Sequence, residues 1–437
     1  MTKNRTVPTW VHFPLQSNTS RLIHVNATAK GGGVAELLSH LVESQASAGL
    51  SVGWGVISGS SEFFDLTKRI HHLLHGSGDA GLLQDDDLAS LYRTTLRPQA
   101  EWFADHLAAG DVVVLHDPQT LGLAPGLSSR GMRVVWHCHI GSKPDETTPH
   151  SAVWQFFEPY LKYVDTVLTS RAEFAPTQVP ESRRHVVLPA IAPESPKNRD
   201  LSDSEVDSRL SGIGLLGHEY AESEAAVEQD GPIPESAPMV LQVSRWDPLK
   251  GMAEVLRSLE RLPPEAHLVL AGPEPREITD DPEGLAVLSQ VRRVREAMPD
   301  ALRVRAHLVT MSMADPERNA LLVNALQRRA DVVTQKSLQE GFGLTVTEAM
   351  LKERAVVASD VGGIRAQIRH GRTGLLVPAE DDAAFADAVA GLLRKPARRR
   401  ELGLAAAAGA RANFLMPRLV HDYRRLVHPT LNLQETT

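Results

Sequence analysis

Cysteine is almost absent from this sequence, which has only Cys138 among its 437 residues. One thiol excludes an intrachain disulfide and a zinc site made of several thiolates. No run of 18 or more apolar residues occurs, and residues 1–15 lack the apolar core of a signal peptide. We therefore expect a cytoplasmic protein that has no membrane partner.

An excess of basic residues is also missing. The sequence has 54 Asp and Glu against 46 Lys and Arg, with a formal net charge of -8. No global positive field is present to hold nucleic acid, so we expect no nucleic-acid partner. The apolar share of 42% and the charged share of 23% are ordinary for globular proteins, and the length favours two or three domains.

Short apolar runs rich in β-branched residues alternate with helical patterns along the whole chain, which is typical of doubly wound α/β sheets. In the first half we predict strands at 22–26, 52–57, 112–116, 134–139, 166–168 and 186–188. In the second half we predict strands at 240–244, 268–271, 304–309, 332–335, 355–359 and 375–377.

An acidic stretch without strand patterns, residues 193–235, separates the two sets of strands. We interpret it as the connection that ends a first domain, 1–235, and precedes a second, 236–412. Residues 413–437 are expected to form a helix that packs back on the first domain. Open α/β sheets bind ligands at the carboxyl ends of their strands, so we expect the site in a cleft between two Rossmann-like domains.

The segment HVNATAKGGGVAELL places Gly31, Gly32 and Gly33 at the start of a predicted helix. Glycines there let backbone amides approach an anion or a sugar oxygen. The spacing differs from G-x-G-x-x-G, which disfavours a nicotinamide cofactor. A tight turn without a ligand is the alternative interpretation.

Two cations follow the predicted strand in VLQVSRWDPLKG, where Arg245 and Lys250 stand at its carboxyl end. The planar fork of Arg and the point charge of Lys both suit a diphosphate. Isolated residues of this kind more often form a solvated surface pair, but their place at a strand end favours a ligand.

The segment LQEGFGLTVTEAM places Glu340 in a glycine loop and Glu348 on the helix that follows it. Carboxylates accept paired hydrogen bonds from vicinal hydroxyls, so one could hold a sugar ring and the other a ribose. The free amides at the helix start would face the diphosphate. An acidic loop residue plus a capping Glu is the alternative.

Several blocks between residues 22 and 420 together resemble a known family. They are HVNATAKGGGVAELL, SSEFFDLTKRIHHLLHG, HDPQTL, VVWHCHI, QVSRWDPLKG, NALQRRADVVTQKSLQEGFGLTVTEAM and VGGIRAQIRHGRTGLLV. They resemble retaining glycosyltransferases of the GT-B fold and, more narrowly, the trehalose-forming glycosyltransferases.

The resemblance implies transfer of glucose from a nucleoside diphosphate donor, with retention of the α anomer, onto a small sugar. It assigns the diphosphate to Arg245 and Lys250 and the donor ribose to Glu348. In this resemblance the donor sugar would be bound by Glu340 with Gly341, Phe342, Gly343, Leu344 and Thr345. The phosphates or the acceptor would lie against Gly32 and Gly33. His139 would lie beside the reacting sugar, and the acceptor side would include Glu36, Asp117 and Gln119.

No cofactor and no metal are expected for this reaction. His71, His72 and His75 share one predicted helix but lack acidic or cysteine partners at ligand spacing, and Asp85 to Asp87 indicate a solvated helix start.

The acceptor side departs from the family pattern. The trehalose-forming enzymes have an acidic residue after Cys-His-Ile, whereas this chain has Gly141, and TSRAEFAP replaces a more apolar segment further on. A modified sugar or a cyclitol is therefore an alternative acceptor. The competing functions are a nucleotide-sugar epimerase and a non-catalytic nucleotide-sugar-binding protein. The sequence is also compatible with a homodimer.

Overall fold

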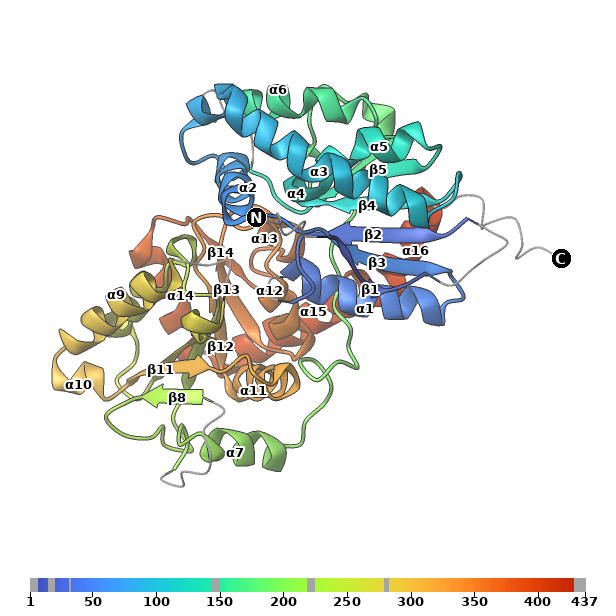
Figure 1. The fold of residues 1–437 in the computed structure, drawn as a ribbon. Coiled ribbons are helices and arrows are strands. Elements are labelled where there is room, and N and C mark those ends of the chain that lie inside the picture. Colours follow the sequence, from blue (N-terminus) through green and yellow to red (C-terminus); the bar gives the residue numbers. More distant parts are fainter. Residues whose placement is uncertain are drawn as a thin grey trace. The chain divides into compact units, whose positions relative to one another are not determined.

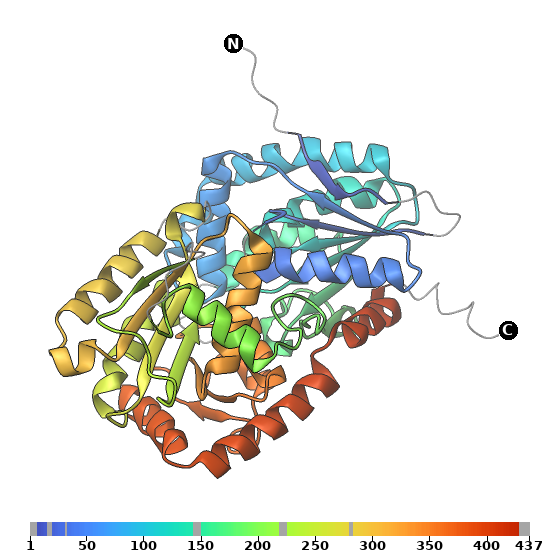
Figure 2. The ribbon, with the colours of Figure 1, turned by 90° about the horizontal axis from the view of Figure 1, so that it is seen from below.

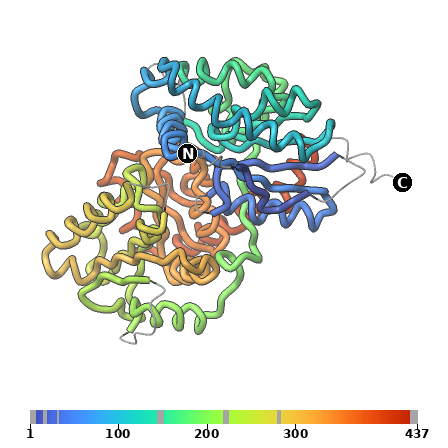
Figure 3. The backbone as a smooth tube through the Cα atoms, viewed as in Figure 1, coloured from blue at the N-terminus to red at the C-terminus, as the bar shows by residue number. Residues whose placement is uncertain are grey.

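The computed structural model describes residues 7–14, 20–30, 33–142, 150–217, 225–278 and 283–427. The chain forms two compact units, one of Met1–Ala190 with Met416–Thr437 and the other of Ile191–Leu415. Its path, traced in Figure 3, therefore passes between the units twice, after Ala190 and after Leu415. Among the described residues, none of the helices combines the length and the apolar character that a membrane crossing needs.

The first unit contains a seven-stranded sheet in the order β1-β3-β2-β4-β5-β6-β7. Its strands are β1 (Thr9–His12), β2 (Leu22–Asn26), β3 (Val52–Val56), β4 (Val112–His116), β5 (Arg133–Cys138), β6 (Thr166–Thr169) and β7 (Arg184–Val186). All neighbours are parallel except β1, which pairs antiparallel with β3. The predicted strand at 186–188 is wrong by two residues, because the pairing ends at Val186 while the apolar run continues.

Helices cover both faces of this first sheet. They are α1 (Gly33–Ser47), α2 (Ser61–Leu74), α3 (Asp86–His106), α4 (Asp117–Thr120), α5 (Ala124–Ser129), α6 (His150–Leu161) and α16 (Met416–Val427). Figure 1 shows α3, α5 and α6 on one side, where Phe103, Trp136 and Phe157 form part of the core. Helices α1 and α16 lie side by side on the other.

The second unit contains another seven-stranded sheet, in the order β14-β13-β12-β9-β10-β11-β8. Its strands are β8 (Ala225–Glu228), β9 (Met239–Val243), β10 (His267–Pro273), β11 (Ala306–Met311), β12 (Val332–Gln335), β13 (Ala355–Ser359) and β14 (Leu375–Val377). Its helices are α7 (Asp203–Gly212), α8 (Met252–Arg257), α9 (Gly284–Glu296), α10 (Asp300–Arg303), α11 (Pro316–Arg329), α12 (Leu344–Leu351), α13 (Ile364–Gln367), α14 (Asp382–Leu393) and α15 (Pro396–Asn413).

The second unit begins at Ile191 rather than near residue 236, where the composition predicted the boundary. The acidic stretch is not a free connection: α7 packs on α11, and β8 extends the second sheet by pairing antiparallel with β11. Ser202 caps α7 through a capping box with Glu205, which explains how so polar a stretch forms a helix. Figure 2 shows α7, in green, within the second unit.

Helix α16 groups with the first unit although 225 residues of the second unit separate it from Ala190. It buries Met416, Leu419, Val420, Tyr423 and Val427. The carbonyl oxygen of Val427 also accepts a hydrogen bond of 3.2 Å from Arg133 Nη1 on β5.

Candidate active site

In the second unit, Lys250 and Glu340 meet beyond the carboxyl ends of β9 and β12. Lys250 Nζ lies 2.7 Å from Glu340 Oε2, and both side chains are mostly buried, with 18% and 13% exposed. Ser337 Oγ and Gln335 Nε2 donate to the same oxygen at 2.9 and 3.3 Å. We call Lys250, Gln335, Ser337 and Glu340 the glutamate–lysine group. These donors fix the orientation of the carboxylate.

The glycine loop holds Glu340 through its backbone. Gly363 N donates to Glu340 O at 3.0 Å, and a Cβ on Gly362 would lie only 1.8 Å from that same oxygen. Gly343 has a φ of 84°, a left-handed conformation that suits glycine. The loop therefore rests directly on the backbone of residues 362 and 363.

Helix α12 starts immediately after this loop. Its N-cap is Gly343, which has no side chain to accept from the first amides. Thr345 Oγ1 donates to Gln335 Oε1 at 3.0 Å, which joins the first turn of the helix to the glutamate–lysine group. The amides of Leu344 and Thr345 lie in the turn where a helix has no internal acceptors.

Arg245 follows β9 and has a 38% exposed side chain. Its Nη2 lies 3.9 Å from Asp247 Oδ2, which is a loose ion pair. The next residue, Trp246, is buried and donates from Nε1 to Pro273 O at 2.8 Å. This anchor fixes the backbone from which the guanidinium of Arg245 extends.

Glu348 lies on α12 but belongs to a different set of contacts from Glu340. Its side chain is 2% exposed, Oε2 accepts from Gln327 Nε2 at 3.2 Å, and Oε1 lies 3.9 Å from Lys197 Nζ. Lys352 Nζ donates to the same Gln327 at 2.7 Å. Among the described residues, the two glutamates are thus held by separate partners. Lys197 was missed because it lies in the stretch interpreted as a connection.

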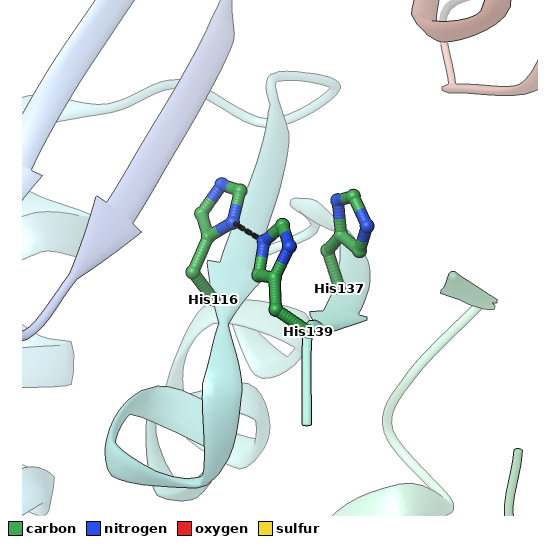
Figure 4. Close-up of side chains that lie close together, drawn as sticks. All are labelled: His116, His137 and His139. Atoms are coloured by element: carbon green, nitrogen blue, oxygen red, sulfur yellow. Dashed lines mark hydrogen bonds between the residues drawn. The ribbon is translucent and has the colours of Figure 1, made fainter. Parts of the chain in front are cut away.

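In the first unit, three histidines form a hydrogen-bonded chain. His24 Nε2 lies 2.9 Å from Gln45 Oε1, and His24 Nδ1 lies 2.9 Å from His116 Nε2. His116 Nδ1 in turn lies 2.9 Å from His139 Nε2, the bond that Figure 4 marks with a dashed line. The register of β2, β4 and β5 produces this chain, because parallel strands bring their carboxyl ends to one edge.

Burial makes these imidazoles neutral. Desolvation lowers the pKa of His24 from 6.5 to about 4, and its hydrogen bond to Gln45 opposes this shift. Desolvation also lowers the pKa of His116, His137 and His139, and the neighbouring imidazoles lower it further. Neutral imidazoles each offer one N–H and one lone pair.

His137 packs against His139, with ring centroids 3.9 Å apart, and its Nδ1 lies 2.6 Å from Tyr423 OH. One ring nitrogen from each of His116, His137 and His139 lies within 4.8 Å of the other two, so these residues could hold a metal ion (Figure 4). However, His116 and His139 share a hydrogen bond of 2.9 Å, whereas two nitrogens of a tetrahedral zinc site lie about 3.3 Å apart. A metal ion bound by these two nitrogens would require that bond to open.

Asp117 directly follows β4 and contacts His139, the candidate active-site histidine. It begins α4 with a φ of 61°, and its Oδ1 accepts from His139 N at 2.7 Å. Burial raises the pKa of its carboxyl from 3.8 to about 7, and the bond from His139 N opposes this shift. Asp117 thus positions the backbone of His139.

The other predicted acceptor-side residues are dispersed along neighbouring elements. Gln119 lies on α4, and among the described residues its buried Oε1 has no hydrogen-bond partner. Gly33 begins α1 and is exposed, and Glu36 lies in the first turn of that helix. Gly32 lies outside the described residues.

Gly141 is buried, and a Cβ placed on it would lie 2.5 Å from Cγ of Phe174. A side chain at position 141 would therefore displace the Phe174 ring. The two departures noted in the sequence, at Gly141 and in residues 169–176, are coupled by this contact.

Comparison with solved structures identifies the fold. The α,α-trehalose-phosphate synthase (UDP-forming) from Burkholderia vietnamiensis aligns with a TM-score of 0.67 and 17% identity, covering 95% of this chain and 99% of that one. The E. coli trehalose-6-phosphate structure bound with UDP-2-fluoro glucose aligns with a TM-score of 0.69 and 15% identity, covering 94% and 99%. The chain therefore has the predicted fold, that of the GT-B glycosyltransferases.

Relatives in sequence define the family. Residues 24–176 match the family described as "Trehalose synthase, N-terminal domain", and residues 223–408 match "Glycosyl transferases group 1". The trehalose synthase of Rubrobacter xylanophilus is 37% identical over 412 residues, which covers 93% of this chain and 90% of that protein. The trehalose synthase of Thermococcus litoralis is 33% identical over 410 residues. The chain belongs to the trehalose synthase family of glycosyltransferases.

Proposed function

We propose that this glycosyltransferase moves an α-glucosyl group, or a related hexosyl group, from a nucleoside diphosphate sugar to a small sugar acceptor with retention of configuration. The glutamate–lysine group beside the start of α12 is the main support, because it joins a carboxylate, an ammonium group and the first turn of a helix that has no side-chain cap at one strand end. The E. coli structure with UDP-2-fluoro glucose shows the same fold with such a donor analogue.

In the proposed donor complex, the diphosphate lies against Arg245, Lys250 and the first amides of α12. The positive end of the helix and the two cations stabilise the charge that grows on the departing phosphate. Glu340 accepts hydrogen bonds from the donor-sugar hydroxyls, and Glu348 is the proposed partner of the ribose.

The proposed reaction proceeds by attack on the same face that the diphosphate leaves. A hydroxyl oxygen of the acceptor forms a bond to the anomeric carbon as the bond from that carbon to the phosphate oxygen breaks. The hydroxyl proton passes to the departing phosphate oxygen. His139 orients a sugar hydroxyl, and no metal or cofactor takes part.

A specific observation favours an acceptor other than glucose as the second candidate. Phe174 occupies the space that any side chain at Gly141 would need. A carboxylate that could bind acceptor hydroxyls is therefore replaced by an aromatic ring, which suits a modified sugar or a cyclitol.

A donor and acceptor panel tests the proposal. Nucleoside diphosphate glucoses would be incubated with and without glucose or a cyclitol, and products identified by nuclear magnetic resonance. Acceptor-dependent nucleotide release with an α-linked product is expected. An altered sugar formed without an acceptor would indicate an epimerase instead, and binding without turnover would indicate a non-catalytic protein.

Glu340→Gln tests the role of the carboxylate within the same assay. We expect kcat to fall by about 100-fold or more, because the hydrogen-bond acceptor and the charge beside Lys250 are weakened. Asp387→Asn is the matched control, since Asp387 forms an exposed ion pair with Arg261 in the same unit. Similar rates for both variants would remove Glu340 from the site.

A further inference from the structure

The hydrogen-bonded histidines of the first unit run in one line from a glutamine to the candidate active-site histidine. The line consists of Gln45 on α1, His24 on β2, His116 on β4 and His139 just beyond β5, with each successive contact 2.9 Å long. Gln45 and His24 are 0% exposed and His116 is 1% exposed, whereas His139 is only partly buried. The chain therefore has a buried end at Gln45 and an accessible end at His139.

We propose that Gln45, His24 and His116 are positioning residues that keep the proton of His139 on Nε2, so that His139 Nδ1 offers its lone pair to a substrate hydroxyl. The proposal rests on the proposed function for the role of His139. It concerns residues that touch one another rather than the donor.

The direction of every bond follows from the orientation of the Gln45 amide, whose Oε1 faces His24 while its buried Nε2 has no hydrogen-bond partner among the described residues. Gln45 Oε1 can only accept, so the proton of His24 is on Nε2 and its Nδ1 is a lone pair. That lone pair requires a proton on His116 Nε2, which leaves His116 Nδ1 as an acceptor. His139 must then donate from Nε2, and its Nδ1 carries the remaining lone pair.

The chain works in this way only if each imidazole has a single proton. Desolvation lowers the pKa of all three rings, so they are neutral near pH 7. Further groups adjoin the chain: the Asp117 carboxyl accepts from the backbone of His139, His137 packs on the His139 ring, and Tyr423 contacts both His137 and the His24 ring. None of these contacts uses Nε2 or Nδ1 of His139, so among the described residues it is the chain that sets its tautomer.

The second unit contains a shorter hydrogen-bonded chain of the same residue types, with one glutamine and two histidines, which supplies a matched control. His267 Nδ1 lies 2.9 Å from His307 Nε2, and His307 Nδ1 lies 2.9 Å from Gln229 Oε1. This chain joins β10, β11 and the residue after β8, and it includes none of the predicted site residues. It shows what a glutamine–histidine chain contributes to stability alone.

The direct test is a nitrogen-15 magnetic resonance measurement on the full-length protein without substrate, with histidine ring nitrogens labelled. We expect His139 to have a protonated Nε2 and an unprotonated Nδ1. A proton on Nδ1 of His139 in the unsubstituted protein would overturn the proposal. This measurement needs no turnover, so its result does not depend on the transfer reaction. Absence of transfer with every nucleotide sugar would instead contradict the proposed function.

Gln45→Met tests the functional consequence, because Met has a similar length but is only a weak acceptor. We expect mixed tautomers of His139, a fall in kcat of about 10-fold or more and little change in the KM for the donor. Gln229→Met should lower the unfolding temperature comparably and leave kcat unchanged. Equal kcat for Gln45→Met and the unsubstituted protein, or an equal fall in both variants, would overturn the proposal.

Discussion

At the scale of single residues, burial decides which side chains carry charge. His24, His116 and His137 are at most 1% exposed, and desolvation lowers the pKa of each ring. Asp117 is shifted in the opposite sense, with its pKa raised to about 7. By contrast, the Glu340 carboxylate is buried with a cation 2.7 Å away. The buried histidines of the first unit are thus neutral near pH 7, whereas the glutamate–lysine group of the second unit contains an ion pair.

The buried histidines predict a loss of stability in mild acid. The unfolded chain takes up protons on these rings below about pH 6.5, whereas the folded chain does not do so until nearer pH 4, the pKa of His24. The stabilisation is complete above pH 6.5 and falls with pH by up to about 1.4 kcal/mol per pH unit for each histidine. Denaturant unfolding at pH 7.5 and pH 5.0, followed by probes in the first unit, measures this change.

Asp117→Asn gives this prediction an internal check. Because the folded pKa of Asp117 is raised from 3.8 to about 7, its carboxyl stabilises the fold increasingly as the pH falls through that interval. Its removal should therefore make the loss of stability in acid steeper. Asn also accepts a hydrogen bond and tolerates a φ of 61°. If the free energy of unfolding of the Asp117→Asn protein did not change between pH 7.5 and pH 5.0, the lowered pKa values assigned to the buried histidines would be contradicted.

At the scale of elements, the glycine loop and the backbone beneath it act as one support for Glu340. Gly362→Ala should disrupt this support, because the new Cβ would lie 1.8 Å from Glu340 O. We expect a loss of about 3 kcal/mol or more in the free energy of unfolding and a loss of transfer activity.

Gly371→Ala is the control for this variant, since Gly371 also has a positive φ of 71° but nothing lies within 4 Å of its Cβ position. It should lose only about 1–2 kcal/mol and retain activity. Denaturant unfolding and the transfer assay measure both properties. An active Gly362→Ala protein with unchanged stability would show that the loop does not rest on Gly362.

Helix α16 belongs to the first unit although the second unit precedes it in the sequence. Leu419→Ala removes a fully buried side chain from this helix, so we expect a cost of about 2–5 kcal/mol within the first unit alone. Hydrogen exchange should accelerate in β2, β4 and β5 but not in β9 to β14. Arg425→Ala, at an exposed position of the same helix, should change neither. Faster exchange confined to the second unit would contradict this grouping.

At the scale of the whole molecule, the proposed chemistry is divided between cations and amides of one unit and neutral histidines of the other. We propose that the reaction needs no metal, because Arg245, Lys250 and the start of α12 would supply the positive charge. Dialysis against a chelator should therefore leave the transfer rate within about 2-fold of its starting value. A rate that is lost and then restored by a divalent cation would reverse this conclusion and direct attention to His116, His137 and His139.

The sequence by itself determined the two sheets and most of their strands. Central parallel strands are buried on both faces, so they appear as β-branched runs, and β2, β4, β12, β13 and β14 were predicted with their observed bounds. The edge strands β1 and β8 were missed, because partly exposed antiparallel edges lack such runs. Local spacing also placed Glu340 in a loop and Glu348 on a helix.

Only the tertiary structure decided which of these residues share a contact. Lys250 meets Glu340 and His24 meets His116 through pairs that are 90 and 92 residues apart in the chain, a separation that no local pattern records. The same is true of Glu348, whose partners Gln327 and Lys197 come from other segments. Strand order and register determine these contacts. Both depend on the packing of the complete sheets.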